Sequence, residues 1–488
     1  MSESLERLAT RCILPGFEGP VAPDWIRRRL QDGLGGVVLY AWNVESRGQL
    51  AALTASLRAE REDVLIAIDE EGGDVTRLEA GTGSSYPGHA VLGVVDDLVL
   101  TERVAESLGA ELAGAGVNLD FAPVADVNTN PDNPVIGVRS FGDDEALVGR
   151  HVAAFVRGLQ RAGVAACAKH FPGHGDTSED SHLALPVVES IDERALEPFR
   201  AAIEAGVRSI MTAHILVRSL GNDPATMNIH VLEELLRREL GYTGLVITDA
   251  LEMRAISATV GVEEGAVRAI VAGADSLCLG HDLFDESVVS VRDALVGAVR
   301  EGRLSEERLA EAASRVSALS AWASDPRAAV EVDQEPGGEA ARRALLVEGD
   351  VAVERPARVL ELEPEPGMAA GRLGQSPGEW LAAGLPDAGL VRVSGPEVDE
   401  IADDRRPLVV VMRDAHRHPW MRSVVEMIVA RELDAVVVEV GLPRWRPTGA
   451  RGYLATYGAG RVSLEAAADR LYSDPRRGVE QSGSSPGS

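Results

Sequence analysis

Short apolar segments alternate with amphipathic segments over the first two thirds of the chain, and this alternation is what most constrains the fold. The apolar runs cover residues 36–40, 64–68, 118–122, 164–168, 209–213, 245–248 and 275–279, and residues 12–14 could supply an eighth. Residues 50–58, 100–115, 145–162 and 232–240 have helical spacing. Strands that alternate with helices form parallel βαβ units. About eight units in roughly 250 to 330 residues predict an α/β fold with a (β/α)8 barrel of the TIM type rather than an open sheet.

A second, smaller α/β domain is predicted after the barrel. Residues 323–339 contain an Asp-Pro pair, a Pro-Gly-Gly run and few apolar side chains, which is typical of a linker. Beyond it, apolar runs return at 406–412 and 435–440 on either side of a helical pattern. We therefore expect a catalytic barrel at 1–325, a linker at 326–345, a domain resembling an αβα sandwich at 346–476 and a disordered Ser/Gly-rich tail at 477–488.

Charge and composition limit which partners and which cellular location are expected. The net charge of −29 repels phosphate backbones and anionic lipids, and aromatic residues make up only 4% of the chain. We expect neither nucleic acid nor a membrane as a partner. Cys12, Cys167 and Cys278 form no CxxC pair and are expected to be buried small hydrophobes. The amino-terminal segment has no apolar core of a secretory signal, so a cytoplasmic location is expected.

Polar side chains follow most of the predicted strands, which is where a barrel places its catalytic groups. They are Asn43, Asp69, Glu70, Glu71, Lys169, His170, His214, Asp249, His281 and Asp282. The set contains carboxylates and imidazoles but no cysteine and no glycine-rich nucleotide loop. It favours hydrolysis or group transfer on a neutral, hydroxyl-rich substrate. The histidines lack metal-ligand spacing such as HExxH, so neither a metal nor another cofactor is expected.

The sequence KHFPGHGDTSEDSH at 169–182 resembles the signature loop of glycoside hydrolase family 3, in its bacterial β-N-acetylhexosaminidase branch. Further motifs follow the order of that family: LPGF at 14–17, IDEEGG at 68–73, NLDFAPVADV at 118–127, IGVRSFG at 136–142, MTAH at 211–214 and ITDALEM at 247–253. The similarity spans about residues 10 to 320. The second domain is similar to the one appended to two-domain members of the family.

The resemblance implies a retaining mechanism with Asp249 as the nucleophile. An ordinary structural role for Asp249 would be to cap a helix that begins near Ala250. The resemblance also implies that His182 is the general acid and base, and that Asp180 orients its imidazole ring. An i, i+2 spacing in an extended loop would put both side chains on one side of the chain. Without the resemblance, both could be solvated loop residues.

Other positions match substrate-binding residues of the family. Asp69, Arg139, Lys169 and His170 are expected to bind hydroxyl groups of the terminal sugar. His214 is expected to support these residues without contacting the sugar itself. Arg77 and Asp120 are weaker candidates, since each could belong to a structural ion pair. His174 is expected only to order its turn. Two positions depart from the family pattern Asp-Gln-Glu-Gly-Gly-Arg, because Glu70 replaces glutamine and Asp74 replaces arginine.

The predicted function is an exo-acting β-N-acetylglucosaminidase that removes terminal N-acetylglucosamine from muropeptides or chitin oligosaccharides. A small carbohydrate is the expected partner. A phosphorylase that releases a sugar 1-phosphate remains open, because a neutral histidine would not repel a phosphate acceptor. A β-glucosidase specificity and a non-enzymatic sugar-binding protein are further alternatives.

Overall fold

The computed structural model describes residues 3–179, 184–282, 284–325, 327–353, 356–363, 374–385, 387–396, 406–431 and 434–472. The chain forms two compact units. Unit 1 comprises Met1–Glu71, Val75–Leu78 and Asp96–Pro336, and unit 2 comprises Gly72–Asp74, Glu79–Val95 and Gly337–Ser488.

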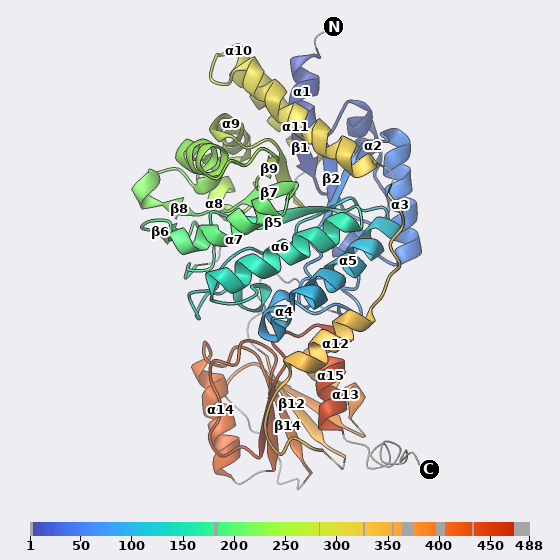
Figure 1. The fold of residues 1–488 in the computed structure, drawn as a ribbon, viewed down its shortest axis with the longest axis vertical. Helices are drawn as coiled ribbons and strands as arrows, with labels where there is room; N and C mark the ends of the chain where they lie inside the picture. Colours follow the sequence, from blue (N-terminus) through green and yellow to red (C-terminus); the bar gives the residue numbers. More distant parts are fainter. Residues whose placement is uncertain are drawn as a thin grey trace, which may run out of the picture. The chain divides into compact units, whose positions relative to one another are not determined.

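Unit 1 is built around parallel strands. They are β1 (Ile13–Pro15), β2 (Gly36–Leu39), β3 (Leu65–Ile68), β4 (Leu119–Asp120), β5 (Ala165–Phe171), β7 (Ser209–Thr212), β9 (Leu245–Ile247) and β10 (Leu277–Gly280). Six of them form a sheet in the order β2-β3-β4-β5-β7-β9, and β10 pairs in parallel with β1. A parallel bridge between Ile247 and Ser276 links β9 to the start of β10. The predicted (β/α)8 barrel is confirmed, with strands at all eight expected runs. Figure 1 shows helices such as α3, α5 and α6 on the outside of these strands.

Helices connect these strands. They are α1 (Leu5–Arg11), α2 (Asp24–Gln31), α3 (Arg47–Glu60), α5 (Leu98–Gly114), α6 (Glu145–Arg161), α7 (Glu193–Glu204), η5 (His230–Glu239), α8 (Arg254–Ser257), α9 (Val262–Ala272), α10 (Asp285–Arg300) and α11 (Glu306–Ser324). Short polar side chains set their starts: Ser46, Asp97 and Asp144 each accept a hydrogen bond from a backbone N–H of the first turn. The small strands β6 (Val187–Val188) and β8 (Leu216–Val217) pair in parallel. Within the described part of the chain, no helix is long and apolar enough to cross a membrane.

The interior of unit 1 is apolar from one strand to the next. Leu14, Leu65, Leu119, Met211 and Ile247 belong to one buried cluster, which also includes residues of α11. Cys12, Cys167 and Cys278 are buried and unpaired, as expected of small hydrophobes. A core packed in this way leaves chemistry to the polar side chains beyond the strand ends.

Unit 2 contains a six-stranded sheet in the order β11-β16-β15-β14-β12-β13. The strands are β11 (Leu346–Gly349), β12 (Arg358–Leu362), β13 (Gly389–Val393), β14 (Leu408–Met412), β15 (Ala435–Glu439) and β16 (Gly452–Ala455), and only the β11–β16 pair is antiparallel. One face packs against α14 (Pro419–Ala430), and the other against α13 (Pro377–Gly384) and α15 (Arg461–Leu471) (Figure 1). The predicted second α/β domain is confirmed.

Unit 2 is discontinuous in sequence, which a single boundary near residue 325 does not anticipate. It takes Gly72–Asp74 and Glu79–Val95, with helix α4 (His89–Val95), from the segment between β3 and β4. Helix α12 (Glu335–Ala344) occupies much of the expected linker. The tail predicted to be disordered lies outside the described residues, which end at Tyr472.

Asp74 shows why the short segment belongs to unit 2. Its buried carboxylate pairs with Arg413, and its Oδ1 accepts a hydrogen bond from the backbone N–H of Ala459 at 2.6 Å. Burial alone would lower the pKa of Arg413, but Asp74 and Asp414 raise it above its ordinary value. The residue that departs from the family pattern is therefore the partner of a buried cation.

Candidate active site

The carboxyl ends of the barrel strands carry most of the residues singled out in the sequence. Asp69 directly follows β3, and Lys169 and His170 lie near the carboxyl end of β5. His214 follows β7, and Asp249 follows β9. Parallel strands of a closed barrel end at one rim. The fold thus gathers these side chains on that rim from distant parts of the sequence.

A buried ion cluster occupies part of the rim. The ammonium group of Lys169 lies 2.7 Å from Asp69 Oδ1 and 2.7 Å from Glu71 Oε1, and its side chain is only 2% exposed. Arg139 donates two hydrogen bonds to Glu71, at 2.9 Å and 2.7 Å. Burial alone would lower the pKa of Lys169, but Asp69 and Glu71 raise it above its ordinary value. Lys169 therefore stays charged, and its charge holds two carboxylates in place.

Glu71 is the residue of this cluster to which the sequence assigned no role. It connects the two predicted sugar-binding cations, Lys169 and Arg139, to each other. In the sequence, the feature that could have identified Glu71 is its place in the IDEEGG motif, two residues after Asp69. Arg77 also approaches the cluster, with its guanidinium 3.9 Å from Asp69 Oδ2.

A second network holds His170. Its Nδ1 lies 2.7 Å from Asp126 Oδ2, and Asp126 Oδ1 accepts a hydrogen bond from the backbone N–H of His174 at 2.7 Å. Burial alone would raise the pKa of Asp126, but His170 and His174 hold it below its ordinary value. Asp126, for which the sequence predicted no role, therefore fixes the orientation of the His170 ring. His174 orders its turn as expected, with its Nδ1 2.7 Å from the hydroxyl group of Thr177.

Asp249 is partly exposed just beyond β9, and it does not cap a helix. Its Oδ1 accepts a hydrogen bond from the adjacent Ala250 N–H at 2.8 Å, but the next helix, α8, begins only at Arg254. His214 Nε2 lies 3.0 Å from the carbonyl oxygen of Ala250, which can only accept, so Nε2 carries a proton. His214 thus supports the backbone next to Asp249 from a fully buried position.

Residues 23–319 match the family described as "Glycosyl hydrolase family 3 N terminal domain". The chain belongs to this family. It is therefore a glycoside hydrolase, as the order of its motifs predicted.

Named relatives agree with the assignment to glycosyl hydrolase family 3. "Beta-hexosaminidase A" of Pseudoalteromonas piscicida is 34% identical over 350 residues, which is 64% of this chain and 58% of that relative. "Beta-hexosaminidase" of Xylella fastidiosa (strain M23) is 35% identical over 58% of this chain and 88% of its own length. The solved family 3 β-N-acetylglucosaminidase of Paenibacillus sp. str. FPU-7 is 35% identical, with a TM-score of 0.86 over 96% of this chain and 97% of that one.

The acid–base pair that the family resemblance implies, Asp180 and His182, lies outside the described residues. The loop that leads to it is anchored up to that point. Asn133 Nδ2 donates to the carbonyl oxygen of His174 at 2.8 Å, and Asn130 Nδ2 donates to that of Thr177 at 2.9 Å.

Glu70, where this family 3 member departs from the family's glutamine, is buried beside the ion cluster. Its Oε2 accepts hydrogen bonds from the backbone N–H groups of Arg77 and Leu78 at 2.8 Å and 2.9 Å. Burial raises the pKa of Glu70 to about 7. The neighbouring Asp120 also has a pKa well above its ordinary value, first through burial and then through Glu70 and Asp69. Asp120 Oδ2 has no hydrogen-bond partner among the described residues.

Replacing Glu70 with glutamine is expected to stabilise the protein above neutral pH. Glu70 is protonated in the folded state at pH values where the unfolded state has lost the proton, so its contribution to stability falls as pH rises from about 4.5 to about 7. A glutamine amide oxygen can accept the same two hydrogen bonds without a charge. We expect a gain of about 2–3 kcal/mol at pH 8 and little change at pH 4.5. Urea unfolding at both pH values checks this, and an equal gain at both would contradict the assignment.

Three further groups of the rim lie close enough to suggest a metal site. Ligand atoms of Glu252, His281 and Asp282 cluster within 4.8 Å. However, the Glu252 oxygens already accept hydrogen bonds from the backbone N–H groups of His281 and Asp282, at 2.7 Å and 2.6 Å, and His281 Nδ1 lies 2.7 Å from Oε1. The cluster is held by its own hydrogen bonds, and we assign it no metal.

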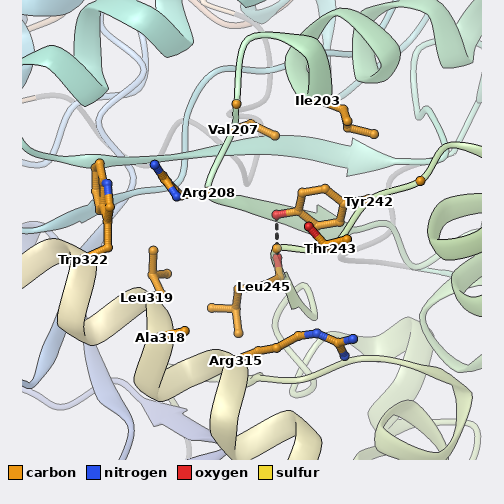
Figure 2. A pocket seen from close by; sticks show the side chains of 13 residues that line it. Ile203, Val207, Arg208, Tyr242, Thr243, Leu245, Arg315, Ala318, Leu319 and Trp322 are labelled. Atoms are coloured by element: carbon orange, nitrogen blue, oxygen red, sulfur yellow. Dashed lines mark hydrogen bonds between the residues drawn. The ribbon is translucent and has the colours of Figure 1, made fainter.

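A cavity of about 360 Å³ lies elsewhere in unit 1. Figure 2 shows it between α11 and the residues that precede β7 and β9, with Arg208 beside Trp322 and with Tyr242 opposite. It therefore lies at the amino ends of these strands, whereas the candidate catalytic residues lie at the carboxyl ends. In barrels the amino-terminal face serves stability, and we assign this cavity no catalytic role.

Proposed function

We propose that this protein is a retaining, exo-acting β-N-acetylglucosaminidase. The observation that carries the proposal is the Asp69–Lys169–Glu71–Arg139 cluster on the rim that also holds Asp249. Fixed carboxylates and cations suit the hydroxyl groups of a single terminal sugar. The specificity for N-acetylglucosamine is proposed from the named activities of the similar proteins.

In the proposed reaction, Asp249 attacks the anomeric carbon while the bond to the leaving oxygen breaks and His182 gives that oxygen a proton. The product of this step is a glycosyl ester on Asp249. His182 then takes a proton from water, the water oxygen bonds to the anomeric carbon, and the ester bond to Asp249 breaks. Asp180 orients the imidazole ring in both steps. His214 holds the Ala250 carbonyl and so keeps the neighbouring Asp249 in position.

The remaining predicted residues would bind the sugar before the reaction. Asp69 and Lys169 offer an acceptor and a donor 2.7 Å apart, which matches neighbouring hydroxyl groups of a pyranose. Arg139, Arg77 and His170 would complete the pocket. Glu71 and Asp126 would act through them, since each holds the predicted sugar-binding residues in a fixed geometry.

The product decides between hydrolysis and phosphorolysis. The purified protein is incubated with 4-nitrophenyl N-acetyl-β-D-glucosaminide, with and without phosphate, and the sugar product is identified. We expect free N-acetylglucosamine at equal rates. N-acetylglucosamine 1-phosphate, formed faster with phosphate, would make the protein a phosphorylase. An Asp249→Asn preparation purified in parallel excludes a contaminating glycosidase.

The two candidate natural substrates differ in their leaving groups, so a comparison of leaving groups can distinguish them. Chitin oligosaccharides and muropeptides both present a terminal N-acetylglucosamine, but the next sugar of a muropeptide carries a carboxylate or a peptide. Their relative kcat/KM values, measured in one mixture, rank the two classes. We also propose a cytoplasmic location, which is tested by fractionating the cells that make the protein.

A further inference from the structure

Three aromatic rings form a compact surface at the carboxyl ends of β2 and β10. Tyr40 and Trp42 stack with ring centroids 5.0 Å apart and an interplanar angle of 19°. The His281 ring lies 5.2 Å from Trp42 and 5.5 Å from Tyr40. Trp42 is 42% exposed, and the His281 side chain is 44% exposed. The rings therefore pack on one another and still present faces to solvent.

The position of Trp42 is fixed by polar contacts. Its indole Nε1 donates a hydrogen bond to the carbonyl oxygen of Phe17 at 3.0 Å. The buried Asn43 donates to the same oxygen at 2.9 Å and accepts from the Tyr40 N–H at 2.8 Å. An exposed tryptophan held in one orientation loses little conformational entropy when a ligand binds.

Two glycines make room for this surface. A Cβ atom at Gly16 would lie 2.7 Å from the Tyr40 ring, and one at Gly280 would lie 2.1 Å from the Glu252 carboxyl group. Gly280 also has φ +88°, which other residues rarely adopt. The absence of a side chain at Gly280 lets Glu252 approach His281. Glu252 Oε1 then lies 2.7 Å from His281 Nδ1 and holds the ring in one orientation.

The surface lies within electrostatic range of the predicted sugar-binding residues. The pKa of Tyr40 is raised well above its ordinary value, chiefly by burial, and both Asp69 and Glu252 add to the effect. Glu252 itself follows Asp249 by three residues. The aromatic surface therefore lies near both Asp69 of the Lys169 cluster and the segment that carries Asp249.

We propose that Trp42, His281 and Glu252 bind the pyranose ring of the leaving group, and that they select an uncharged sugar. This inference rests on the proposed glycosidase function. Stacking on an exposed indole suits the apolar face of a pyranose. Glu252 Oε2, which accepts one hydrogen bond from the Asp282 N–H, keeps a second lone pair that can accept from a sugar hydroxyl group. Glu252 and Asp282 place two carboxylates beside one imidazole. Their charge disfavours a leaving group that carries its own carboxylate.

The test compares two leaving groups in one enzyme. N,N′-diacetylchitobiose releases a pyranose, whereas methyl N-acetyl-β-D-glucosaminide releases methanol and leaves nothing to stack. Trp42→Ala is expected to lower kcat/KM for the disaccharide about 5- to 10-fold, mainly through KM, and to leave the methyl glycoside within about 2-fold. Trp42→Phe, which keeps a ring, should recover most of the loss. Trp322→Phe, at the amino ends of the strands, controls for tryptophan replacement as such.

Each outcome decides the inference. Equal losses on both substrates, or no loss on either, would overturn it, because Trp42 would then serve structure alone. Binding of the disaccharide to Asp249→Asn and Asp249→Asn/Trp42→Ala, measured by calorimetry, gives a second readout without turnover and is expected to differ by the same factor. A disaccharide with N-acetylmuramic acid as the leaving sugar should be the poorer substrate, and equal or better turnover would overturn the uncharged selection. If the unmodified protein cleaves no N-acetylglucosaminide, the proposed function itself fails.

Discussion

Replacing Asp249 with asparagine is expected to lower kcat/KM for 4-nitrophenyl N-acetyl-β-D-glucosaminide by about 10⁴-fold. The neutral amide cannot form the glycosyl ester, while its oxygen can still accept the hydrogen bond that Ala250 N–H donates at 2.8 Å. Folding should be unaffected because the side chain is partly exposed and caps no helix. Steady-state kinetics and the unfolding midpoint measure the two effects.

Asp223→Asn is the matched control for Asp249→Asn. Asp223 is an exposed aspartate of the same unit, and it forms a surface ion pair with Arg268 at 3.5 Å. It should retain full activity. Mass spectrometry of the protein treated with a slow fluorosugar substrate adds a direct test, since the adduct should map to the peptide that contains Asp249. An adduct on another carboxylate, or normal turnover by Asp249→Asn, would remove Asp249 from its proposed role.

Replacing Glu71 with glutamine is expected to destabilise unit 1 by about 3–5 kcal/mol at pH 7.5. Glu71 is buried between Arg139 and Lys169, so the substitution leaves buried positive charge without its counter-charge. Activity should fall as well, because both cations lose the contact that positions them. Urea unfolding and steady-state kinetics on the same preparations check the prediction.

Glu70→Gln is the matched control for Glu71→Gln, because it makes the same chemical change one residue earlier. Glu70 is equally buried but accepts hydrogen bonds from the backbone N–H groups of Arg77 and Leu78, and burial raises its pKa to about 7. The two substitutions should therefore shift stability in opposite directions at pH 7.5. Shifts of the same sign would mean that the ionic partners of Glu71 contribute little.

The barrel could be predicted from the sequence because its signal is local. Each strand is a short apolar run, and polar residues such as Asp69, Lys169 and Asp249 come directly after the runs. Their meeting on one rim then follows from the topology alone. Glu71 and Asp126 were harder to identify because what distinguishes them is a partner 68 or 44 residues away, and no local pattern encodes such a pair.

The sequence limits of unit 2 could not be predicted from local patterns either, because they depend on contacts between residues far apart in the chain. Asp74 looked like an unexplained departure from the family motif. It is explained only by Arg413, which is 339 residues further along the chain. The aromatic surface of Tyr40, Trp42 and His281 likewise joins two strand ends that are far apart in sequence.

The split sequence of unit 2 has a consequence for folding during synthesis. At about 5–20 residues per second, the ribosome needs on the order of 20–70 s to make the 339 residues that separate Asp74 from Arg413. Until then the Asp74 carboxylate lacks both Arg413 and the Ala459 N–H, although the flanking strands β3 and β4 are made early in that interval. Nascent barrels thus carry an unfinished loop with a solvated carboxylate. The Asp74 carboxylate can become buried only after Arg413 and Ala459 are made. The last strands of unit 2 therefore pack against a segment that was synthesised long before them.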